Sequence, residues 1–440
     1  MSGGGNRTPS LHEDTQATID GAAQLGLCLV LRGDEPLAGS ERWPLAQLDE
    51  VVLGRAERSA VALVGRQLRI AVNDPYISTS HARLLRCVNG WAIEDLGSKN
   101  GTLLNGTPCA RAMLSDGDAI ALGTASFMFA TSVDRRDLGP LATLTPQVRE
   151  VHDKLAKVAE SNLPVVLLGE TGVGKEVAAR AIHDLSHRKG SYVAVNCGAL
   201  PATLLEATLF GHRRGAFTGA HDHQPGVVYS AHQGTLFLDE VGELSPAAQV
   251  ALLRVLQESE VVPVGGTEAR RVNVRVVAAT NRDLAADIAG GRFREDLYAR
   301  LAGLAVRLPP LRDRRADLGL LVRAILLRVA PAPGEVRITA RAARALLEHA
   351  WPQNVRELEM CLRQAGAFAG WHKIDLYHLP DATRHTAAPL VERDRLEGLL
   401  RSHRGNVSEV ARELGTSRTQ VHRMLRRCAI EPGPFRECPR

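Results

Sequence analysis

The segment from residue 164 to residue 186 constrains the fold more than any other part of the sequence. An apolar run, PVVLLGE, leads into the glycine-rich loop Gly169–Lys175, and an amphipathic run, EVAARAIHDLS, follows it. Glycines let backbone N–H groups turn toward an anion, and the first turn of a helix adds positive potential there. This order of strand, loop and helix is typical of a phosphate-binding loop in an α/β domain; a chance glycine-rich turn is the alternative.

The loop predicts a nucleotide site in which Lys175 contacts the β- and γ-phosphates of ATP. The general pattern has Ser or Thr after the lysine to hold Mg²⁺, whereas this chain has Glu176. The residues that we expect around the nucleotide are Gly169, Glu170, Thr171, Gly172, Val173, Gly174, Lys175 and Glu176.

Three further segments carry polar residues at the ends of apolar runs or on a helix. GTLFLDE ends in Asp239 and Glu240, which could hold Mg²⁺ and polarise the attacking water, or could be two exposed acids. VRVVAATN ends in Asn281, which could sense the γ-phosphate or simply occupy a turn. In FREDLYARL, Arg294 and Arg300 could reach the ATP of a neighbouring subunit, or belong to a salt-bridged surface helix.

Changes of pattern along the 440 residues predict a multidomain protein. Short apolar runs between turn residues favour an all-β domain, and alternating strands and helices favour a parallel α/β sheet. The expected regions are a disordered tail at 1–24, an all-β domain at 25–131, a linker at 132–143, an α/β domain at 144–310, a helical extension at 311–382, a linker at 383–390 and an all-α C-terminal domain at 391–432.

The composition favours a cytoplasmic protein. No apolar run is long enough to span a membrane, and the N-terminus lacks the pattern of a signal peptide. The seven cysteines form no CxxC pair, so neither a zinc site nor a disulfide framework is expected. Eleven Arg against seven Asp or Glu make residues 391–440 basic, which suggests a polyanion partner or, alternatively, a solvated helical face.

The segment LFGHRRGAFTGAHDH lies between the phosphate loop and the acidic pair. The glycines and the single aromatic side chain of its central hexapeptide predict only a flexible loop that could press on a partner. The central residues are Gly215, Ala216, Phe217, Thr218, Gly219 and Ala220.

Taken together, these motifs resemble the bacterial enhancer-binding proteins, the NtrC-like AAA+ activators of sigma-54 RNA polymerase. The matching segments are GETGVGKE, GAFTGA, GTLFLDE, VVAATNRDL, FREDLYARL, LPPLRDR and WPQNVREL, and they follow the family's order over about 140–382. The family also has a glutamate at the position of Glu176. Thr208, Ala299 and Gln353 depart from common family residues, and none of them removes a catalytic group.

The resemblance implies roles for residues around the nucleotide. Lys175 would bind phosphates, Asp239 would hold Mg²⁺, and Glu240 would activate water. Asn196 would pair with Glu240 and relay the state of the nucleotide, and Asn281 would be a first sensor.

The resemblance also implies a ring, normally a hexamer. Arg294 and Arg300 would complete the site of the next subunit, and Arg356 would be a second sensor on a helical lid. Phe217 and Thr218 would contact sigma-54, and a second loop would lie near 259–270.

Near the C-terminus, GNVSEVARELGTSRTQVHRMLRRC resembles the Fis-type helix-turn-helix of the same family, with a dimerising helical hairpin as the alternative. The first helix would cover 407–414, Gly415 would form the turn, and Ser417 would cap the recognition helix. The expected buried side chains are Val410, Leu414, Val421, Met424 and Leu425. The residues left for DNA are Ser417, Arg418, Thr419, Gln420, His422, Arg423, Arg426 and Arg427.

At the other end, LGR (53–55), SxxH (78–81) and SKNGT (98–102) resemble a forkhead-associated (FHA) domain, a β-sandwich that binds phosphothreonine. Arg55 would pair with the phosphate, and Ser78 and Asn100 would donate hydrogen bonds to it. Thr79 stands where many such domains carry Arg or Asn. Arg66 is a rival for the role of Arg55, and a sandwich used only for packing is the alternative.

The sequence therefore predicts a transcription activator that binds upstream DNA, oligomerises, and uses ATP and Mg²⁺ to remodel a sigma-54 closed complex into an open one. No receiver-like aspartate pocket precedes the ATPase motifs, so we expect control through a phosphothreonine protein or a Ser/Thr kinase. The rival interpretations are an AAA+ remodeller of other clients and a DNA-binding regulator without ATPase activity.

Overall fold

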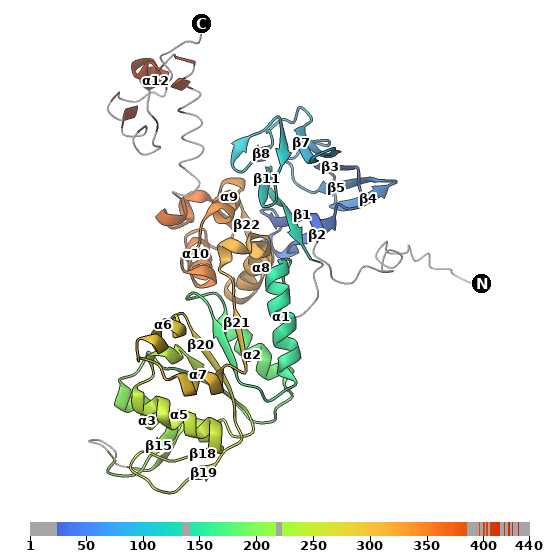
Figure 1. Cartoon of the computed structure of the whole chain (residues 1–440). Coiled ribbons are helices and arrows are strands. Elements are labelled where there is room, and N and C mark those ends of the chain that lie inside the picture. Colours follow the sequence, from blue (N-terminus) through green and yellow to red (C-terminus); the bar gives the residue numbers. More distant parts are fainter. Residues whose placement is uncertain are drawn as a thin grey trace, which may run out of the picture.

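The structure, a computed structural model, describes residues 24–133, 141–216 and 222–384. Beyond 384 it describes residues 396, 399–400, 402–403, 405–413, 418, 421–422, 425 and 430. Figure 1 shows three parts: a β-sandwich (24–133), an α/β domain (141–310) and, between them, a helical lid (311–384). Within these described residues, no helix is long and apolar enough to cross a membrane.

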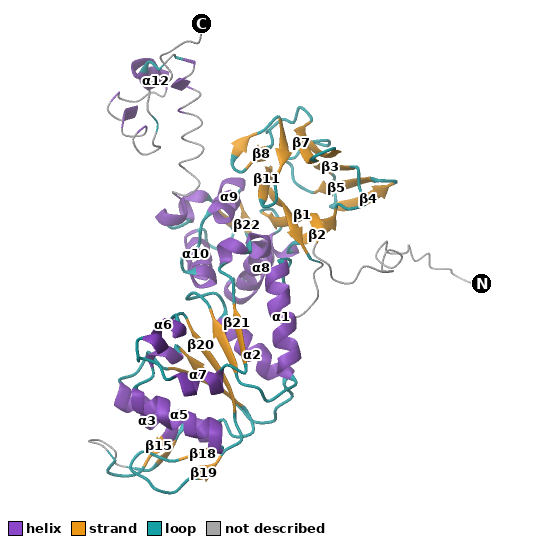
Figure 2. Cartoon of the chain, viewed as in Figure 1, coloured by secondary structure: helices purple, strands orange, loops and turns teal. Residues whose placement is uncertain are grey.

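The β-sandwich has two six-stranded sheets, in the orders β2-β1-β12-β11-β8-β9 and β10-β7-β6-β3-β5-β4 (Figure 2). Its elements are β1 (Gln24–Arg32), η1 (Pro36–Ala38), β2 (Glu41–Pro44), β3 (Glu50–Arg55), β4 (Ala60–Val64), β5 (Gln67–Val72), β6 (Ala82–Cys87), β7 (Gly90–Asp95), β8 (Leu103–Leu104), β9 (Thr107–Pro108), β10 (Arg111–Leu114), β11 (Asp118–Leu122) and β12 (Ala125–Ser132). The expected all-β sandwich is thus confirmed.

The long stretch between Arg55 and Ser78 is a folded β-hairpin rather than an open loop. Strands β4 and β5 pair antiparallel, and β5 returns alongside β3 in parallel, with Arg55 opposite Val72. The return brings residues 73–81 back to the end of β3, where the backbone N–H of Arg55 donates to the carbonyl oxygen of Ser78. The hairpin therefore explains how two distant motifs meet.

The α/β domain is built on a parallel five-stranded sheet of order β14-β17-β20-β13-β21. Its strands and helices alternate as the sequence predicts, and the α/β fold class is confirmed. The elements are α1 (Pro146–Ala159), β13 (Val165–Leu168), α2 (Lys175–Leu185), β14 (Tyr192–Asn196), α3 (Ala202–Phe210), β15 (Gly211–His212), β16 (Gln224–Pro225), α4 (Val227–Ser230), β17 (Thr235–Asp239), η3 (Val241–Glu243), α5 (Pro246–Glu258), β18 (Glu260–Val261), β19 (Arg270–Arg271), β20 (Arg275–Thr280), α6 (Leu284–Ala289), α7 (Glu295–Leu301) and β21 (Leu304–Arg307).

Both faces of this sheet are buried, because successive side chains of a strand point to opposite faces. Leu236 and Leu238 of β17 join a core with α3, α5 and α7, whereas Phe237 joins a core with α1 and α2. The helices thus cover the two faces separately and leave the carboxyl ends of the strands for polar side chains.

The sequence pattern suggests a lid that is helical throughout, whereas the structure also contains a pair of short strands. Its helices are joined by a short parallel pair in which Ile338 lies opposite Ile374, and both side chains are buried. The elements are η4 (Leu311–Asp313), η5 (Arg315–Asp317), α8 (Leu318–Val329), η6 (Pro333–Glu335), β22 (Arg337–Ile338), α9 (Ala340–Glu348), α10 (Asn354–Phe368), β23 (Lys373–Ile374) and η7 (Leu376–His378).

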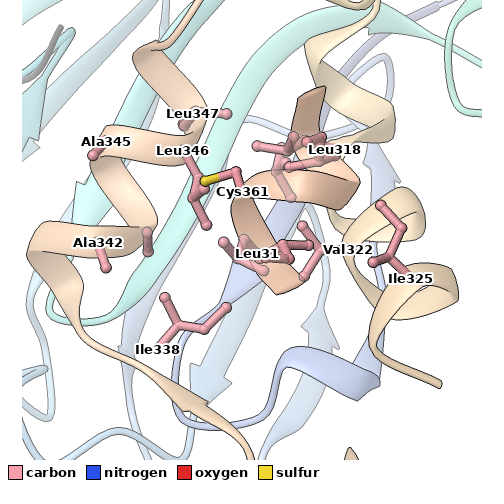
Figure 3. Close-up of a cluster of buried hydrophobic side chains, with 14 of the residues drawn as sticks. Leu31, Leu318, Val322, Ile325, Ile338, Ala342, Ala345, Leu346, Leu347 and Cys361 are labelled. Carbon is pink, nitrogen blue, oxygen red and sulfur yellow. The ribbon is translucent and has the colours of Figure 1, made fainter. Parts of the chain in front are cut away.

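The β-sandwich and the lid share one hydrophobic core. Alternate residues of β1 serve two cores: Leu27 and Leu29 face the interior of the sandwich, while Cys28 and Val30 pack into the lid cluster. Figure 3 shows Leu31 of β1 among Leu318, Val322 and Ile325 of α8 and residues of α9. The two parts therefore dock through buried apolar contacts rather than through a linker alone.

Gly319 marks the closest approach in this docking. A Cβ atom at Gly319 would lie 1.6 Å from the carbonyl oxygen of Val30 and 2.7 Å from Oγ of Ser40. The backbones of α8 and β1 can approach this closely only because residue 319 has no side chain.

Farther along the chain, α12 (Val407–Glu413) belongs to a small separate cluster with buried Leu396, Leu400, Val421 and Leu425. The burial of Val410, Val421 and Leu425 agrees with the expected inward side of the helix-turn-helix. Leu414, Gly415, Ser417 and Met424 lie outside the described residues.

We predict that Gly319→Ala lowers the midpoint of thermal unfolding, although alanine by itself favours a helix by about 1 kcal/mol over glycine. The added methyl group collides with backbone, and overpacking of this kind costs about 1–3 kcal/mol. Gly334→Ala is the control, because a Cβ atom there meets nothing within 4 Å. An unchanged or raised midpoint for Gly319→Ala would contradict the close docking.

Candidate functional site

The glycine-rich loop joins the end of β13 to the start of α2, as the sequence predicts. Gly172 and Gly174 have positive φ values of 78° and 104°, which favour glycine. The amino group of Lys175 donates to the carbonyl oxygens of Gly169 at 2.9 Å and of Glu170 at 3.2 Å. Burial lowers the pKa of Lys175, and the nearby carboxylates of Glu240 and Asp239 oppose that shift.

The acidic pair lies beside this loop at the end of β17. The backbone N–H of Glu240 donates to Oδ1 of Asp239 at 3.1 Å, and Glu240 has a left-handed φ of 52°. Glu240 thus adopts the left-handed conformation directly after the end of β17. Glu240 is linked to the loop through Asn281, which bonds both Glu240 and Thr171.

Asn281 links a third strand end to the loop. Its side-chain amide donates to Oγ1 of Thr171 at 3.1 Å, and its backbone N–H donates to Oε2 of Glu240 at 3.4 Å. The predicted neighbourhood of Lys175, Asp239, Glu240 and Asn281 is thus brought together by three parallel strands that end at one edge.

Asn196 ends β14, with its Cα opposite Asp239. Its side-chain oxygen accepts from the N–H of Gly198 at 2.9 Å. Within the described residues, no hydrogen bond joins Asn196 to Glu240, which instead accepts from Asn281. The expected pairing of Asn196 with Glu240 is therefore absent from this arrangement, although both residues lie at the same edge.

The lid covers the glycine-rich loop through a buried asparagine that sequence reasoning missed. Oδ1 of Asn354 accepts from the N–H of Leu311, and Nδ2 donates to the carbonyl oxygen of Thr171 at 3.0 Å and to Oε2 of Glu170 at 3.1 Å. A Cβ atom at Gly172 would lie 2.2 Å from the carbonyl oxygen of Gln353. Asn354 lies in the motif WPQNVREL, in which the family resemblance implies a role for Arg356 alone.

Two arginines of the motif LPPLRDR complete this contact, and sequence reasoning gave neither a role. The buried guanidinium of Arg314 donates to the carbonyl oxygen of Val173 at 2.6 Å. Arg312 binds both carboxylate oxygens of Glu170, at 2.6 and 2.9 Å. These bonds, together with that from Asn354, lower the pKa of Glu170 to about 2. The carboxylate of Glu170 is therefore committed to the lid, although its backbone belongs to the loop.

Arg356 lies in the first turn of α10, directly over the loop. Its Cβ atom would be 2.9 Å from a Cβ atom at Gly172, and the N–H of Val355 donates to the carbonyl oxygen of Gly172 at 3.0 Å. The charge of Arg356 also opposes protonation of Lys175. A cationic residue of the lid thus lies close to the loop, and its role as a second sensor stays a prediction.

Arg294 and Arg300 lie at the two ends of α7 and are exposed. Arg294 pairs with Asp296 through two hydrogen bonds, of 3.0 and 2.6 Å. The structure of one chain thus leaves Arg300 available at the surface and holds Arg294 in a local ion pair.

The candidate partner loop starts from β15, and the second expected loop lies between β18 and β19. The two are joined: the N–H of Arg213 donates to the carbonyl oxygen of Val264, and the N–H of Val264 donates to that of Gly211. Arg213 also pairs with Glu268 at 2.7 Å. Gly215 is exposed and Ala216 half-buried, whereas Phe217, Thr218, Gly219 and Ala220 lie outside the described residues.

The candidate phosphothreonine site lies at one end of the sandwich. Arg55 ends β3 and is exposed; its Nη1 donates to the carbonyl oxygen of Pro75 at 3.4 Å. Nδ2 of Asn100 donates to the carbonyl oxygen of Tyr76, and Oγ of Ser78 accepts from the N–H of Lys99. Thr79 is exposed on the same loop.

Arg66, the alternative to Arg55, lies at the end of the sheet opposite the candidate phosphothreonine site. Arg66 pairs with Asp49 at 2.7 Å, just before the start of β3, whereas Arg55 is the last residue of that strand. The buried ring of His81 holds the two loops of the Arg55 end together: Nδ1 accepts from the N–H of Ser78, and Nε2 bonds the carbonyl oxygen of Gly101. The geometry thus favours Arg55.

Of the candidate DNA-contacting residues, the structure describes Arg418 and His422, and both are exposed. The other six lie outside the described residues; they are Ser417, Thr419, Gln420, Arg423, Arg426 and Arg427.

Comparison with known families identifies the class of each part. A Sigma-54 interaction domain matches residues 141–307, and an AAA+ ATPase lid domain matches 312–395. An FHA domain matches residues 51–123, and the Fis family of bacterial regulatory proteins matches 387–427. The chain thus combines an FHA sandwich, an AAA+ module and a Fis-type helix-turn-helix.

The relatives define the family. The transcriptional regulatory protein GlrR of Escherichia coli (strain K12) is 38% identical over 336 residues, which cover 73% of this chain and 76% of GlrR. The chain belongs to the sigma-54-dependent transcriptional activators, the bacterial enhancer-binding proteins.

Two other similarities cover less of the relative or are more distant. The Nif-specific regulatory protein of Azotobacter vinelandii is 52% identical over half of this chain (50%), and that match spans 43% of the relative's own length. A crystal structure of NtrX from Brucella abortus in complex with ADP is 29% identical, with a TM-score of 0.51, and covers 67% of this chain and 70% of NtrX.

We predict that Asn354→Asp lowers the free energy of unfolding by about 1–3 kcal/mol. The change removes the donor to Thr171 and Glu170 and places a second carboxylate beside Glu170. Gln353→Glu, which adds the same charge at an exposed neighbour, should stay within about 0.5 kcal/mol of the parent. Equal thermal midpoints for the two variants would show that Asn354 does not hold the lid on the loop.

Proposed function

We propose that this protein is a transcription activator that binds DNA upstream of a promoter and uses ATP hydrolysis to convert a sigma-54 closed complex into an open one. The observation that carries this proposal is the meeting of Lys175, the acidic pair and Asn281 at one sheet edge, under a lid that presents Arg356. The relative NtrX has been crystallised with ADP and with ATP, which supports a nucleotide at this edge.

Lys175 would hold the β- and γ-phosphates, because its amino group lies in the loop and its present acceptors are only backbone carbonyls. Mg²⁺ usually keeps several waters and takes one or two carboxylates besides phosphate oxygens, so Asp239 fits as its protein ligand. The metal would neutralise charge on the phosphates.

Glu240 would orient the attacking water and accept its proton. Oxygen of that water bonds to the γ-phosphorus, the bond to the bridging oxygen of ADP breaks, and phosphate leaves. The link from Glu240 through Asn281 to Thr171 gives the base a contact with the loop that surrounds the phosphates. Asn196 lies at the same edge and could exchange with Asn281 as partner of Glu240.

We infer that hydrolysis needs a ring, normally a hexamer, in which Arg294 and Arg300 of one subunit complete the nucleotide site of the next. Arg300 is exposed on α7, and Arg294 is held only by an exposed pair with Asp296. Such exposed pairs contribute little to stability and can be exchanged for the phosphates of a neighbour.

The output would be the loop Gly215–Ala220, with Phe217 and Thr218 in contact with sigma-54. Backbone bonds from Arg213 to the hairpin of β18 and β19 support coupled movement of the two loops. Figure 1 shows this end of the α/β domain far from the β-sandwich, which leaves it open to a large partner.

Regulation would come from phosphothreonine bound by Arg55, Ser78, Thr79 and Asn100, on a partner protein or a Ser/Thr kinase. DNA would be bound by the recognition helix, for which a cluster of arginines without acids from 416 to 428 provides phosphate contacts.

We predict that Lys175→Ala abolishes nucleotide binding, hydrolysis and promoter opening together, because the cation at the phosphates is lost. Full activation by Lys175→Ala would refute the ATP requirement.

We predict that Thr218→Ala leaves steady-state ATPase activity within about twofold and ends open-complex formation, because residue 218 serves the partner rather than the nucleotide. Normal open-complex formation by Thr218→Ala would refute the role of the loop.

We predict that Arg55→Ala in the full chain weakens binding of phosphothreonine peptides by tenfold or more, since a charge-assisted pair contributes about 1.5–3 kcal/mol. Arg66→Ala removes an arginine of similar exposure at the other end of β3 and should bind as the parent does. The measurement is fluorescence anisotropy with phosphorylated and unphosphorylated forms of each peptide. Equal binding of the two forms by the parent would exclude phosphothreonine recognition.

A further inference from the structure

A cleft of about 670 Å³ lies between the FHA sandwich and the lid. On the sandwich side it is lined by Asp74, Pro75, Tyr76 and Asn100. On the lid side it is lined by the segment 337–341, by Arg344 and by Lys373. The shared hydrophobic core holds the two walls together, so the cleft is a built part of the fold.

The sandwich wall of the cleft belongs to the candidate phosphothreonine site. Asn100 lines the cleft and bonds the carbonyl oxygen of Tyr76, which lines it too. Arg55 bonds the carbonyl oxygen of Pro75, another lining residue. A peptide whose phosphothreonine binds at Arg55 and Asn100 would therefore extend one of its flanks toward the lid.

The acidic groups that line the cleft are Asp34, Asp74 and Asp375. Asp34 pairs with Arg32 at 3.5 Å through Oδ2, and its buried Oδ1 has no hydrogen-bond partner among the described residues. The carboxylate of Asp74 accepts from the N–H of Tyr76 and from both the N–H and the hydroxyl of Thr124. Asp375 accepts from the hydroxyl of Thr339 and the N–H of Leu376. The charges of Asp74 and Asp375 are thus stabilised by hydrogen bonds within the protein.

The cations of the lid wall are less committed. Arg341 and Lys373 are exposed, and among the described residues neither forms an ion pair. The Nε atom of Arg344 is buried, and the described part of the chain offers it no hydrogen-bond acceptor. Buried N–H donors without an acceptor are unusual, and an anionic ligand would supply one.

We propose that the lid forms the second half of the phosphopeptide site, and that its occupant is a phosphothreonine peptide with acidic residues beside the phosphothreonine. The FHA loops bind the phosphate, and Arg341, Arg344 and Lys373 bind the acidic flank. This inference rests on the proposed recognition of phosphothreonine by Arg55. It adds two statements to that proposal. The residues beside the phosphothreonine are acidic, and the bound peptide contacts both the FHA sandwich and the lid.

The test uses the full chain and two degenerate phosphothreonine peptide libraries, one with Asp and Glu in the flanks and one with Ala and Ser. Binding is measured by fluorescence anisotropy for the parent, for the double variant Arg341→Ala/Lys373→Ala, and for Arg55→Ala. Arg363→Ala is the control, because it removes an exposed lid arginine of α10 that does not line the cleft. Thermal midpoints verify that each variant is folded.

We expect the double variant to lose about tenfold in affinity for the acidic library and to keep the parent's affinity for the neutral library. The Arg363→Ala control should match the parent with both libraries. Equal binding of the acidic library by the parent and the double variant would overturn the proposal that the lid binds the acidic flank. It would leave phosphothreonine recognition by the FHA loops intact. An equal loss with both libraries would also overturn the proposal for the lid, because the lid cations would then not select the flank.

Failure of the underlying function has a different signature. In that case the parent and Arg55→Ala bind phosphorylated and dephosphorylated libraries alike, and both proposals fall. Loss of binding in Arg55→Ala together with an unchanged double variant separates the two proposals.

Discussion

Strand β1 packs into two hydrophobic cores at once, and this double burial determines where the parts of the chain lie. Alternation of side chains along a strand puts Leu27 and Leu29 into the sandwich and Cys28 and Val30 into the lid. A sheet that normally shows one face to water instead buries both over this stretch. The FHA sandwich therefore cannot turn freely against the lid, since separation would expose apolar side chains of β1, β12, α8 and α9 to water.

The lid is held in turn against the nucleotide loop, and here the contacts are hydrogen bonds rather than apolar packing. Asn354 and Arg314 bind backbone carbonyl oxygens of Thr171 and Val173, so these two bonds depend on where the loop backbone lies. Asn354 also binds the carboxylate of Glu170, the one loop side chain that takes part. Buried hydrogen bonds of this type are directional and costly to leave unmade. A shift of the lid therefore has to break or remake them. Apolar burial thus holds the sandwich against the lid, and directional hydrogen bonds hold the lid against the nucleotide loop.

The sequence predicts some parts of this series and not others, for physical reasons. Lys175, Asp239 and Asn281 each end or follow a strong apolar run, and parallel strands bring such ends to one edge, so local pattern was enough to place them together. Gly319 carries no local signature, and Asn354 lies in the motif WPQNVREL without a local sign of its contacts. The importance of both residues comes from what approaches them in space. Arg66 follows a glycine as Arg55 does, and the sequence favours Arg55 because Leu53-Gly54-Arg55 better ends a strand. The return of β5 beside β3 places the two arginines at opposite ends.

The shared core also decides how the phosphopeptide site has to be studied. A fragment of residues 25–131 would keep Arg55, Ser78 and Asn100, yet it would expose Val30 and Met128, which the lid buries in the whole chain. Such a surface favours association of the fragment with itself. The fragment would also lack the wall that carries Arg341 and Lys373, so its affinity would reflect the phosphate alone. Selectivity for the flanking residues, if it arises from the lid, is a property of the sandwich and the lid together.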